Sequence, residues 1–256
     1  MPTWDPGVYL HFANQRTQPA IDLIARIRLT HPARVIDLGC GPGNSTAVLR
    51  ERWPNADITG LDSSADMLAA ATQAHPTGKW MLADAASWQA TLPIDLVFSN
   101  AALQWIPNHA ALFTHLMTQV APNGALAVQV PAHYASPIHR VTLEVANDPV
   151  WRRLMDEPQR ALTYETPAFY YAILQPFAAD IDIWETEYYH IVDNAQAIVT
   201  WFRGTGLRPF LEALETAEQR QQFEQRVLEG YTQAYPPQAD GRILFPFRRL
   251  FMVAYR

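Results

Sequence analysis

The chain has a single cysteine, Cys40, which excludes an intramolecular disulfide framework and a cysteine-rich zinc site. Lys79 is its only lysine, so Schiff-base chemistry has one poor candidate. No uninterrupted apolar segment approaches the roughly 20 residues that a membrane span requires. The first residues also lack the basic and apolar regions of a secretory signal. We therefore expect a soluble, cytoplasmic protein.

A basic excess is also missing, since the formal net charge is -6. Nucleic-acid binding requires a basic face that neutralises phosphates, and no basic run occurs here. The histidines lack metal-ligand spacing, so we expect no metal. The chain is rich in arginine, with 12 of these residues from Arg140 onward. The rigid, forked guanidinium of arginine is well suited to bind carboxylates. Most arginines are solvated surface residues, so this excess is only a hint.

From about residue 20 to 131, helix-like and strand-like segments alternate. The predicted strands are 34–38, 56–61, 80–82, 95–99 and 124–130. The predicted helices are 45–53, 65–74 and 109–120, with Asn44 and Ser64 as N-caps of the first two. This alternation is typical of a parallel sheet with helices on both faces.

The pattern changes after Pro131. Residues 132–177 are rich in aromatics and are interrupted by five prolines, which predicts a cap of short helices. A strand is expected at 180–192, then a pair of helices separated by residues 204–206, then a last strand near 244–254. A chain of 256 residues suits one α/β domain with an elaboration.

The strongest motif is a glycine loop between the first predicted strand and the first predicted helix. Gly39, Gly41 and Gly43 alternate with other residues, which lets the main chain turn sharply and approach a ligand closely. Such a loop indicates a nucleotide-like ligand. Asp37, just ahead of it, would repel a pyrophosphate but suits a ligand that bears an amino group and a sulfonium. An ordinary tight turn is the alternative.

Polar residues also follow the next three strands. Asp62 lies 21 residues after Gly41, a spacing that favours hydrogen bonds to ribose hydroxyls over a helix cap. Asp84 could accept from an adenine amine, and Asn100 stands at the tip of the fourth strand. Open α/β sheets bind ligands at this edge, so we expect these side chains to share one site.

These motifs resemble those of class I S-adenosylmethionine-dependent methyltransferases. The resemblance runs nearly end to end, through residues 4–12, 37–45, 102–105, 187–190 and 204–209. It implies an α/β, Rossmann-like sheet, mostly parallel with an antiparallel last strand, and a helical cap between the fifth and sixth strands. It also implies a single methyltransferase domain over residues 1–256, in which residues 1–19 cover the cofactor and 132–178 form the cap.

The resemblance implies S-adenosyl-L-methionine as cofactor and S-adenosyl-L-homocysteine as product. Arg16 stands beside Gln15, and which of the two points inward stays open. The residues implied to bind the cofactor are Tyr9, Phe12, Arg16, Asp37, Gly39, Gly41, Gly43, Asp62, Ser63, Met67, Asp84, Ala85 and Asn100.

The resemblance outside the glycine loop, at residues 4–12, 102–105, 187–190 and 204–209, implies that the acceptor is a small polycarboxylic acid, with trans-aconitate as the leading candidate. No catalytic residue is expected, because a carboxylate is already ionised at neutral pH and needs only to be positioned. The candidate substrate-binding residues are Trp105, His139, Arg140, Tyr170 and Arg208. Base rates favour a core role for Trp105 and a surface role for His139 and Arg140, whereas their places after strands favour the site.

Other hypotheses stay open at this point. The acceptor could be a different small carboxylic acid. A nicotinamide-dependent oxidoreductase shares the strand, the loop and the downstream acid, but its third loop glycine is replaced here by Asn44. The chain could also be a non-catalytic S-adenosylmethionine-binding module. Cys40 is expected to fill space in the loop and not to act as a nucleophile.

Overall fold

The computed structural model describes residues 13–132, 135–163 and 165–256, with only the backbone of residues 13–16. The chain divides into two compact units. Unit 1 comprises Met1–Pro131, Glu165–Thr186 and Arg249–Arg256, and unit 2 comprises Ala132–Tyr164 and Glu187–Arg248. Within the described residues, no helix is long and apolar enough to cross a membrane.

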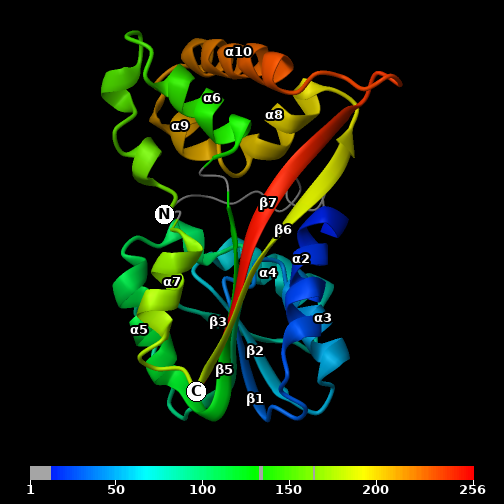
Figure 1. Ribbon diagram of the computed structural model, residues 1–256, viewed down its shortest axis with the longest axis vertical. Coiled ribbons are helices and arrows are strands. Elements are labelled where there is room, and N and C mark those ends of the chain that lie inside the picture. The colour runs from blue at the N-terminus through cyan, green and yellow to red at the C-terminus, as the bar shows by residue number, and fades with distance from the viewer. Residues whose placement is uncertain (1–12, 133–134, 164) are drawn as a thin grey trace. The chain divides into compact units, whose positions relative to one another are not determined.

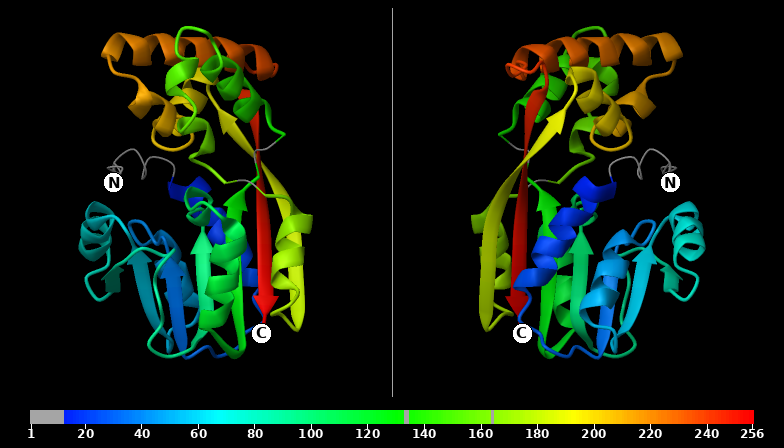
Figure 2. Two further views of the ribbon diagram at one scale, coloured as in Figure 1. Left: turned by 90° about the vertical axis from the view of Figure 1, so that its left-hand side faces the viewer. Right: turned by 90° about the vertical axis from the view of Figure 1, so that its right-hand side faces the viewer.

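A seven-stranded sheet of order β3-β2-β1-β4-β5-β7-β6 organises unit 1 (Figures 1 and 2). Strands β3, β2, β1, β4 and β5 pair in parallel, whereas β7 runs antiparallel to β5. This arrangement confirms the predicted sheet with its antiparallel last strand. The strands are β1 (Arg34–Leu38), β2 (Asp57–Asp62), β3 (Lys79–Leu82), β4 (Ile94–Asn100), β5 (Val120–Pro131), β6 (Asp180–Val192) and β7 (Ile243–Tyr255), of which β6 and β7 contribute residues to both units.

Helices cover both faces of this sheet. The helical elements of unit 1 are α2 (Ala13–Arg26), α3 (Asn44–Arg52), α4 (Ala65–Ala74), η1 (Leu103–Trp105), α5 (His109–Gln119) and α7 (Pro167–Leu174). Helices α5 and α7 lie on one face, and α2 and α3 lie on the other (Figures 1 and 2). Because both faces are covered, the central strands are buried apolar runs, such as Leu96, Val97 and Phe98 of β4.

The two predicted helix caps have different outcomes. Ser64 caps α4, and its hydroxyl accepts a hydrogen bond from the Met67 N–H at 3.3 Å. The prediction for Asn44 is wrong, because Asn44 is already the first residue of α3. Gly43 occupies the cap position with φ 91°, a left-handed conformation that glycine adopts without steric cost, and among the described residues no side chain caps this helix.

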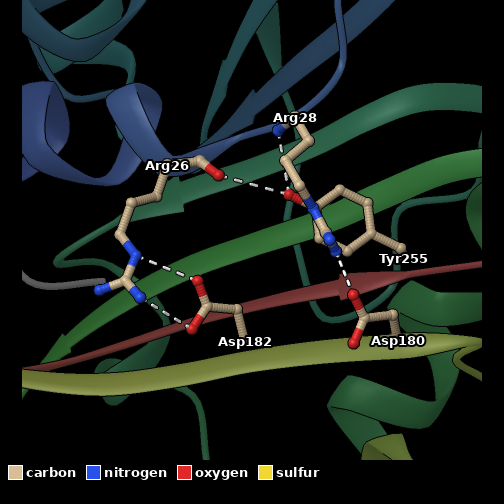
Figure 3. A network of polar contacts seen from close by, with 5 residues as sticks. All are labelled: Arg26, Arg28, Asp180, Asp182 and Tyr255. Carbon is tan, nitrogen blue, oxygen red and sulfur yellow. Dashed lines mark hydrogen bonds and ion pairs between the residues drawn. The ribbon is translucent and has the colours of Figure 1, made fainter.

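A network of polar contacts joins the end of α2 to β6 and β7 (Figure 3). Arg26 Nε lies 3.0 Å from Asp182 Oδ2, and Arg28 pairs with Asp180. The Arg28 N–H donates to the Tyr255 hydroxyl at 3.0 Å, and its guanidinium lies 4.1 Å from the centre of that ring. Exposed ion pairs contribute only about 0–1 kcal/mol each, so the network mainly orients the helix.

Unit 2 consists of packed helices together with the residues of β6 and β7 that belong to it. It contains α6 (Pro137–Ala146), α8 (Ala195–Arg203), α9 (Arg208–Ala213) and α10 (Ala217–Ala234), with the short turns η2 (Arg152–Leu154) and η3 (Pro158–Arg160). The predicted short helices of residues 132–178 are therefore present, but α7 belongs to unit 1. The predicted break at 204–206 separates α8 from α9.

Helices α6 and α10 approach each other closely at Gly230. A Cβ added there would lie 2.4 Å from Val141 Cγ1, so a larger residue fits only if Val141 shifts. Beside this contact, the hydroxyls of Thr142 and Tyr231 are 2.8 Å apart, and the Ile138 N–H donates to the Tyr235 hydroxyl at 2.9 Å. These contacts give unit 2 a packed interior of its own.

Candidate functional site

The glycine loop connects β1 to α3 and is tied to β2. The N–H groups of Gly39 and Cys40 donate to the Leu61 carbonyl at 2.7 and 3.0 Å. Gly39 has φ +67°, and a Cβ there would lie 2.2 Å from Ala102 Cβ. A larger residue at this position would collide with the segment that follows β4, so the loop and that segment are held in direct contact.

The other two glycines of the loop face different surroundings. A Cβ on Gly41 would meet nothing within 4 Å, so this backbone borders open space that a ligand can occupy. A Cβ on Gly43 would lie 2.8 Å from Trp80 Cη2 and 3.0 Å from His75 Cδ2. In this structure Gly43 packs against aromatic rings, and Gly41 provides the open backbone.

Asp37 is completely buried beneath this loop. Its Oδ2 accepts hydrogen bonds from Ser45 Oγ at 2.7 Å and Thr46 Oγ1 at 2.6 Å. Its Oδ1 is also buried and has no hydrogen-bond partner among the described residues. Burial raises the pKa of this carboxyl to about 6, against the two hydroxyl donors, which lower it. The buried oxygen is an acceptor suited to a cationic or hydrogen-bond-donating ligand.

Asp62 at the end of β2 is held by backbone N–H groups on both carboxylate oxygens. Oδ2 accepts from Gly41 and Oδ1 accepts from Ser64, each at 2.9 Å. Burial raises the pKa of Asp62, and these N–H donors lower it. Ser64, not Asp62, caps α4. Each oxygen keeps a second lone pair, so the carboxylate is oriented and still able to accept from two further hydroxyls.

The remaining cofactor candidates continue along the same edge. Asp62 pairs in register with Leu82, and the Ala83 N–H donates to the Asp62 carbonyl at 3.1 Å, which brings the start of the β3 loop beside β2. Asp84 is exposed and accepts from the Ala86 N–H at 2.9 Å, while Ala85 is buried. Ser63 is exposed, and Met67 is buried in the first turn of α4.

The segment after β4 makes a sharp turn at the same edge. Asn100 is the last residue of β4, and Ala101 adopts φ 55°. The Ala101 N–H donates to the Gln129 carbonyl at 2.9 Å. Trp105 ends η1 and is half-buried in unit 1. The structure therefore places Asp37, Asp62, Asp84 and Asn100 at the carboxyl ends of neighbouring parallel strands, as predicted.

Three predicted cofactor-binding residues fall outside the described part of the chain. Tyr9 and Phe12 lie outside the described residues, and so does the side chain of Arg16.

Cys40 in the glycine loop is buried, and burial raises the pKa of its thiol far above the ordinary value. This finding agrees with a space-filling role, because a thiol that resists ionisation is a poor nucleophile.

The five substrate-binding candidates fall in both units. Trp105 and Tyr170 belong to unit 1, and His139, Arg140 and Arg208 belong to unit 2. Arg140 is exposed and lies 3.7 Å from Glu144, as expected of a solvated helix face. His139 is half-buried, and burial lowers its pKa.

His139 lines a small cavity inside unit 2. Its other walls include Thr142, Phe202, Gly206 and Phe210, and its volume is about 30 Å³. That space suits one or two waters, not a polycarboxylic acid. His139 is therefore placed beside residues that precede Arg208, but the cavity itself is not an acceptor site.

Arg208 is the first residue of α9, and Pro209 stands in the first turn of the helix. Only 11% of its side chain is exposed. Burial lowers the pKa of the guanidinium, while Glu212, 3.8 Å from Nε, raises it. The predicted turn thus holds a largely buried arginine, and the ion pair with Glu212 is the structural alternative to a carboxylate-binding role.

Tyr170 is fully buried in unit 1, in contact with α5 residues. Its hydroxyl lies 2.6 Å from His109 Nδ1, and His109 Nε2 lies 3.0 Å from the Leu103 carbonyl. A carbonyl only accepts, so Nε2 carries the proton and Nδ1 accepts from the tyrosine. These contacts favour a structural role for Tyr170.

Tyr170→Phe should therefore lower the free energy of unfolding by about 1–3 kcal/mol, because Nδ1 of the buried His109 loses its donor. Urea unfolding measures this change. The KM for the acceptor should stay within about twofold. Tyr171→Phe, at the exposed neighbouring position, is the control. A raised KM with unchanged stability would restore the substrate role.

Sequence reasoning missed several buried polar residues in unit 1, among them Gln104, Gln129 and Arg249. A signal for two of them was available. Gln129 interrupts an apolar strand, and Arg249 stands within the aromatic and apolar residues of β7. A polar side chain at a core position of a strand indicates a buried hydrogen bond or a site.

The chain is similar to known proteins along its whole length. A family model described as a methyltransferase domain matches residues 9–213. A trans-aconitate 2-methyltransferase of Azoarcus sp. (strain BH72) is 48% identical, with both chains fully covered. A protein of the same name from Methylobacterium nodulans is 48% identical, covering 100% of this chain and 99% of the relative.

A solved structure shares the fold at low identity. It is Haemonchus contortus phosphoethanolamine N-methyltransferase 2 in complex with S-adenosyl-L-methionine, with a TM-score of 0.57 and 16% identity. The match covers 93% of this chain and 52% of that one. At this identity the likeness concerns the fold alone.

Proposed function

The chain belongs to the trans-aconitate 2-methyltransferase family, and from this premise we propose that it methylates a carboxylate of trans-aconitate. The products are a monomethyl ester and S-adenosyl-L-homocysteine. The relatives carry the choice of acceptor, and the observation that carries the choice of methyl donor is the buried Asp37 oxygen without a partner among the described residues, together with the open backbone at Gly41. This pair suits a cationic methyl donor and disfavours a pyrophosphate. Family membership also decides against the nicotinamide-dependent and non-catalytic alternatives.

The residues present fit S-adenosyl-L-methionine. Asp62 is oriented by two backbone donors and can accept from ribose hydroxyls. Asp37 places negative charge beneath the loop for the methionine part, and Gly41 offers backbone with no side chain in the way. Asp84, exposed after β3, would accept a hydrogen bond from the adenine amine. When bound, S-adenosyl-L-methionine supplies a methyl group on a positively charged sulfur.

The protein's task is positioning. An ionised carboxylate needs no general base, since its pKa near 4 leaves it deprotonated at neutral pH. Alignment of the reacting groups can supply roughly 7–11 kcal/mol of barrier reduction. A polycarboxylate also has carboxylates that do not react, and Arg208 is a largely buried cation suited to bind one of them. Tight binding of the reacting carboxylate would instead stabilise the ground state and slow methyl transfer.

A screen of small carboxylic acids tests this function directly. We expect trans-aconitate to give the highest kcat/KM, scored by release of S-adenosyl-L-homocysteine and by mass spectrometry of the ester. A higher kcat/KM for another acid would change the acceptor and keep the chemistry. Release of S-adenosyl-L-homocysteine without formation of any methyl ester would overturn the proposal of carboxyl methylation.

The pH dependence should separate binding from chemistry. With saturating S-adenosyl-L-methionine, kcat should be nearly flat from about pH 6 to 8, because the nucleophile is ionised throughout. Binding of S-adenosyl-L-methionine to the free protein should depend on pH, because the pKa of Asp37 is about 6. Below that pH Asp37 is protonated, and a cationic ligand must expel the proton, so affinity should fall by about tenfold between pH 7 and pH 5. Calorimetric titration and steady-state rates measure the two effects.

The sign for stability is the opposite of the usual aspartate case. Because burial raises the pKa of Asp37 from 3.8 to about 6, the folded chain binds this proton more tightly than the unfolded chain. The stability that Asp37 contributes is fully present below pH 3.8 and is lost as the pH rises to about 6.

The pH profile of kcat tests the carboxylate mechanism separately. A kcat that climbs tenfold per pH unit above 6 would contradict this mechanism, because the carboxylate is already ionised there.

A cytoplasmic location is also part of the proposal. A single buried cysteine, Cys40, suits a reducing compartment. Cell fractionation with an antibody to the chain tests it.

A further inference from the structure

Two buried polar side chains form a pair in unit 1 that the proposed cofactor site does not use. Gln129 on β5 is 0% exposed and Arg249 on β7 is 4% exposed. Arg249 Nη1 donates to Gln129 Oε1 at 3.3 Å. An amide and a guanidinium that are both removed from water are uncommon inside a sheet, so the pair calls for an explanation.

The pair lies next to the edge that carries the cofactor candidates. Gln129 is in register with Asn100, and its carbonyl accepts from the Ala101 N–H. Ala102, one residue further, is the residue against which Gly39 packs. The backbone of Gln129 is therefore joined to the glycine loop through residues 100–102.

The orientation of the amide defines what the pair can bind. Because Oε1 of Gln129 accepts from Arg249, its Nε2 is a separate donor on the same group. This Nε2 is buried and has no hydrogen-bond partner among the described residues. An unsatisfied buried donor costs free energy. An ionised carboxylate would satisfy it with one oxygen and would supply negative charge to the guanidinium with the other.

We propose that Arg249 and Gln129 bind one non-reacting carboxylate of the acceptor acid. The inference rests on the proposed function, because it deepens the account of the same acceptor site. Gln129 acts here as a direct donor and also holds the guanidinium in place. A polycarboxylate is then recognised by a charge-and-amide pair that a monocarboxylate cannot use fully.

The sharpest test is Gln129→Glu. This nearly isosteric change gives Arg249 an internal carboxylate and places a negative charge where the acceptor's carboxylate would bind, without opening a cavity. We expect the KM for trans-aconitate to rise by about tenfold or more, with S-adenosyl-L-methionine affinity within about threefold and the melting temperature undiminished. Arg249→Gln should raise the same KM, but it also removes a buried charge.

The neighbouring arginine provides a matched control. Arg248 has a side chain that is 44% exposed and lies 3.5 Å from Glu187, so Arg248→Gln should leave the KM unchanged. A folded Gln129→Glu protein with wild-type KM would overturn the proposal and assign the pair a purely structural role. The same conclusion would follow if Arg248→Gln raised the KM equally.

Analogues of the acceptor separate this inference from the proposed function. The wild-type enzyme should lose about tenfold in kcat/KM when the carboxylate bound by this pair is replaced by a neutral amide, and Gln129→Glu should lose much less. Equal losses in both proteins would overturn the pair's role while the enzyme still methylates trans-aconitate. If the proposed function is wrong, the wild-type enzyme forms no ester from trans-aconitate. The variants are then compared with the acid that the wild-type enzyme prefers.

Discussion

Asp62→Ala is expected to weaken S-adenosyl-L-methionine binding by about tenfold or more while the fold stays intact. The two carboxylate oxygens are aimed by the N–H groups of Gly41 and Ser64 and would each accept a ribose hydroxyl. Hydrogen bonds to a charged group contribute roughly 1.5–3 kcal/mol each, so losing both should be visible in a calorimetric titration.

Two comparisons make the Asp62 experiment decisive. Asp66→Ala removes an exposed acid from the first turn of α4 and should leave the affinity unchanged. Asp62→Asn keeps one oxygen but loses the charge, so its affinity should fall between those of the other two proteins. If Asp62→Ala binds the cofactor as tightly as wild type and has a normal circular dichroism spectrum, the ribose assignment is wrong.

Arg208→Ala is expected to lower kcat/KM for the acceptor by roughly ten- to a hundredfold, with S-adenosyl-L-methionine affinity hardly changed. This range corresponds to a charge-assisted pair of roughly 1.5–3 kcal/mol. The side chain is largely buried at the start of α9, which limits its freedom before a ligand binds. Arg208→Lys should recover only part of the loss, because an ammonium cannot bind a carboxylate in the bidentate geometry of arginine.

The ion pair with Glu212 gives the competing explanation for Arg208. If Arg208 serves mainly to pair with this residue, then Arg208→Ala and Glu212→Gln should lower the melting temperature alike and leave the acceptor KM intact. If it binds substrate, Glu212→Gln should keep the KM while Arg208→Ala raises it. Thermal melting beside steady-state kinetics on the same preparations distinguishes these outcomes.

The strands and the loop were predictable because their signals are local. Residues 34–38 and 180–192 were predicted with the bounds that the structure has, since apolar runs and alternation report burial directly. The N-cap of α3 was not predictable from local signals, because two residues compete for that position. Asn44 has the side chain of a cap, but Gly43 can adopt the left-handed conformation that the turn requires.

The site was predictable only in part. The acids at strand ends follow from parallel pairing, which brings Asp62 and Asn100 to one edge without further information. Tyr170 shows the limit of this reasoning. Its sequence position allowed an acceptor contact, yet its hydroxyl is satisfied by His109, 61 residues away along the chain. A partner at that separation leaves no local pattern.

The sequence by itself determined the alternating sheet, the glycine loop and the row of acids, because backbone torsions and hydrophobic periodicity act over a few residues. Tertiary structure alone decided which polar groups lose their water. It buried Asp37 and so raised its pKa to about 6, and it set Gly39 against Ala102. It also joined Gln129 to Arg249, 120 residues apart, through strands whose pairing depends on the whole unit. Desolvation arises from all the atoms packed around a group, so no short stretch of sequence encodes it.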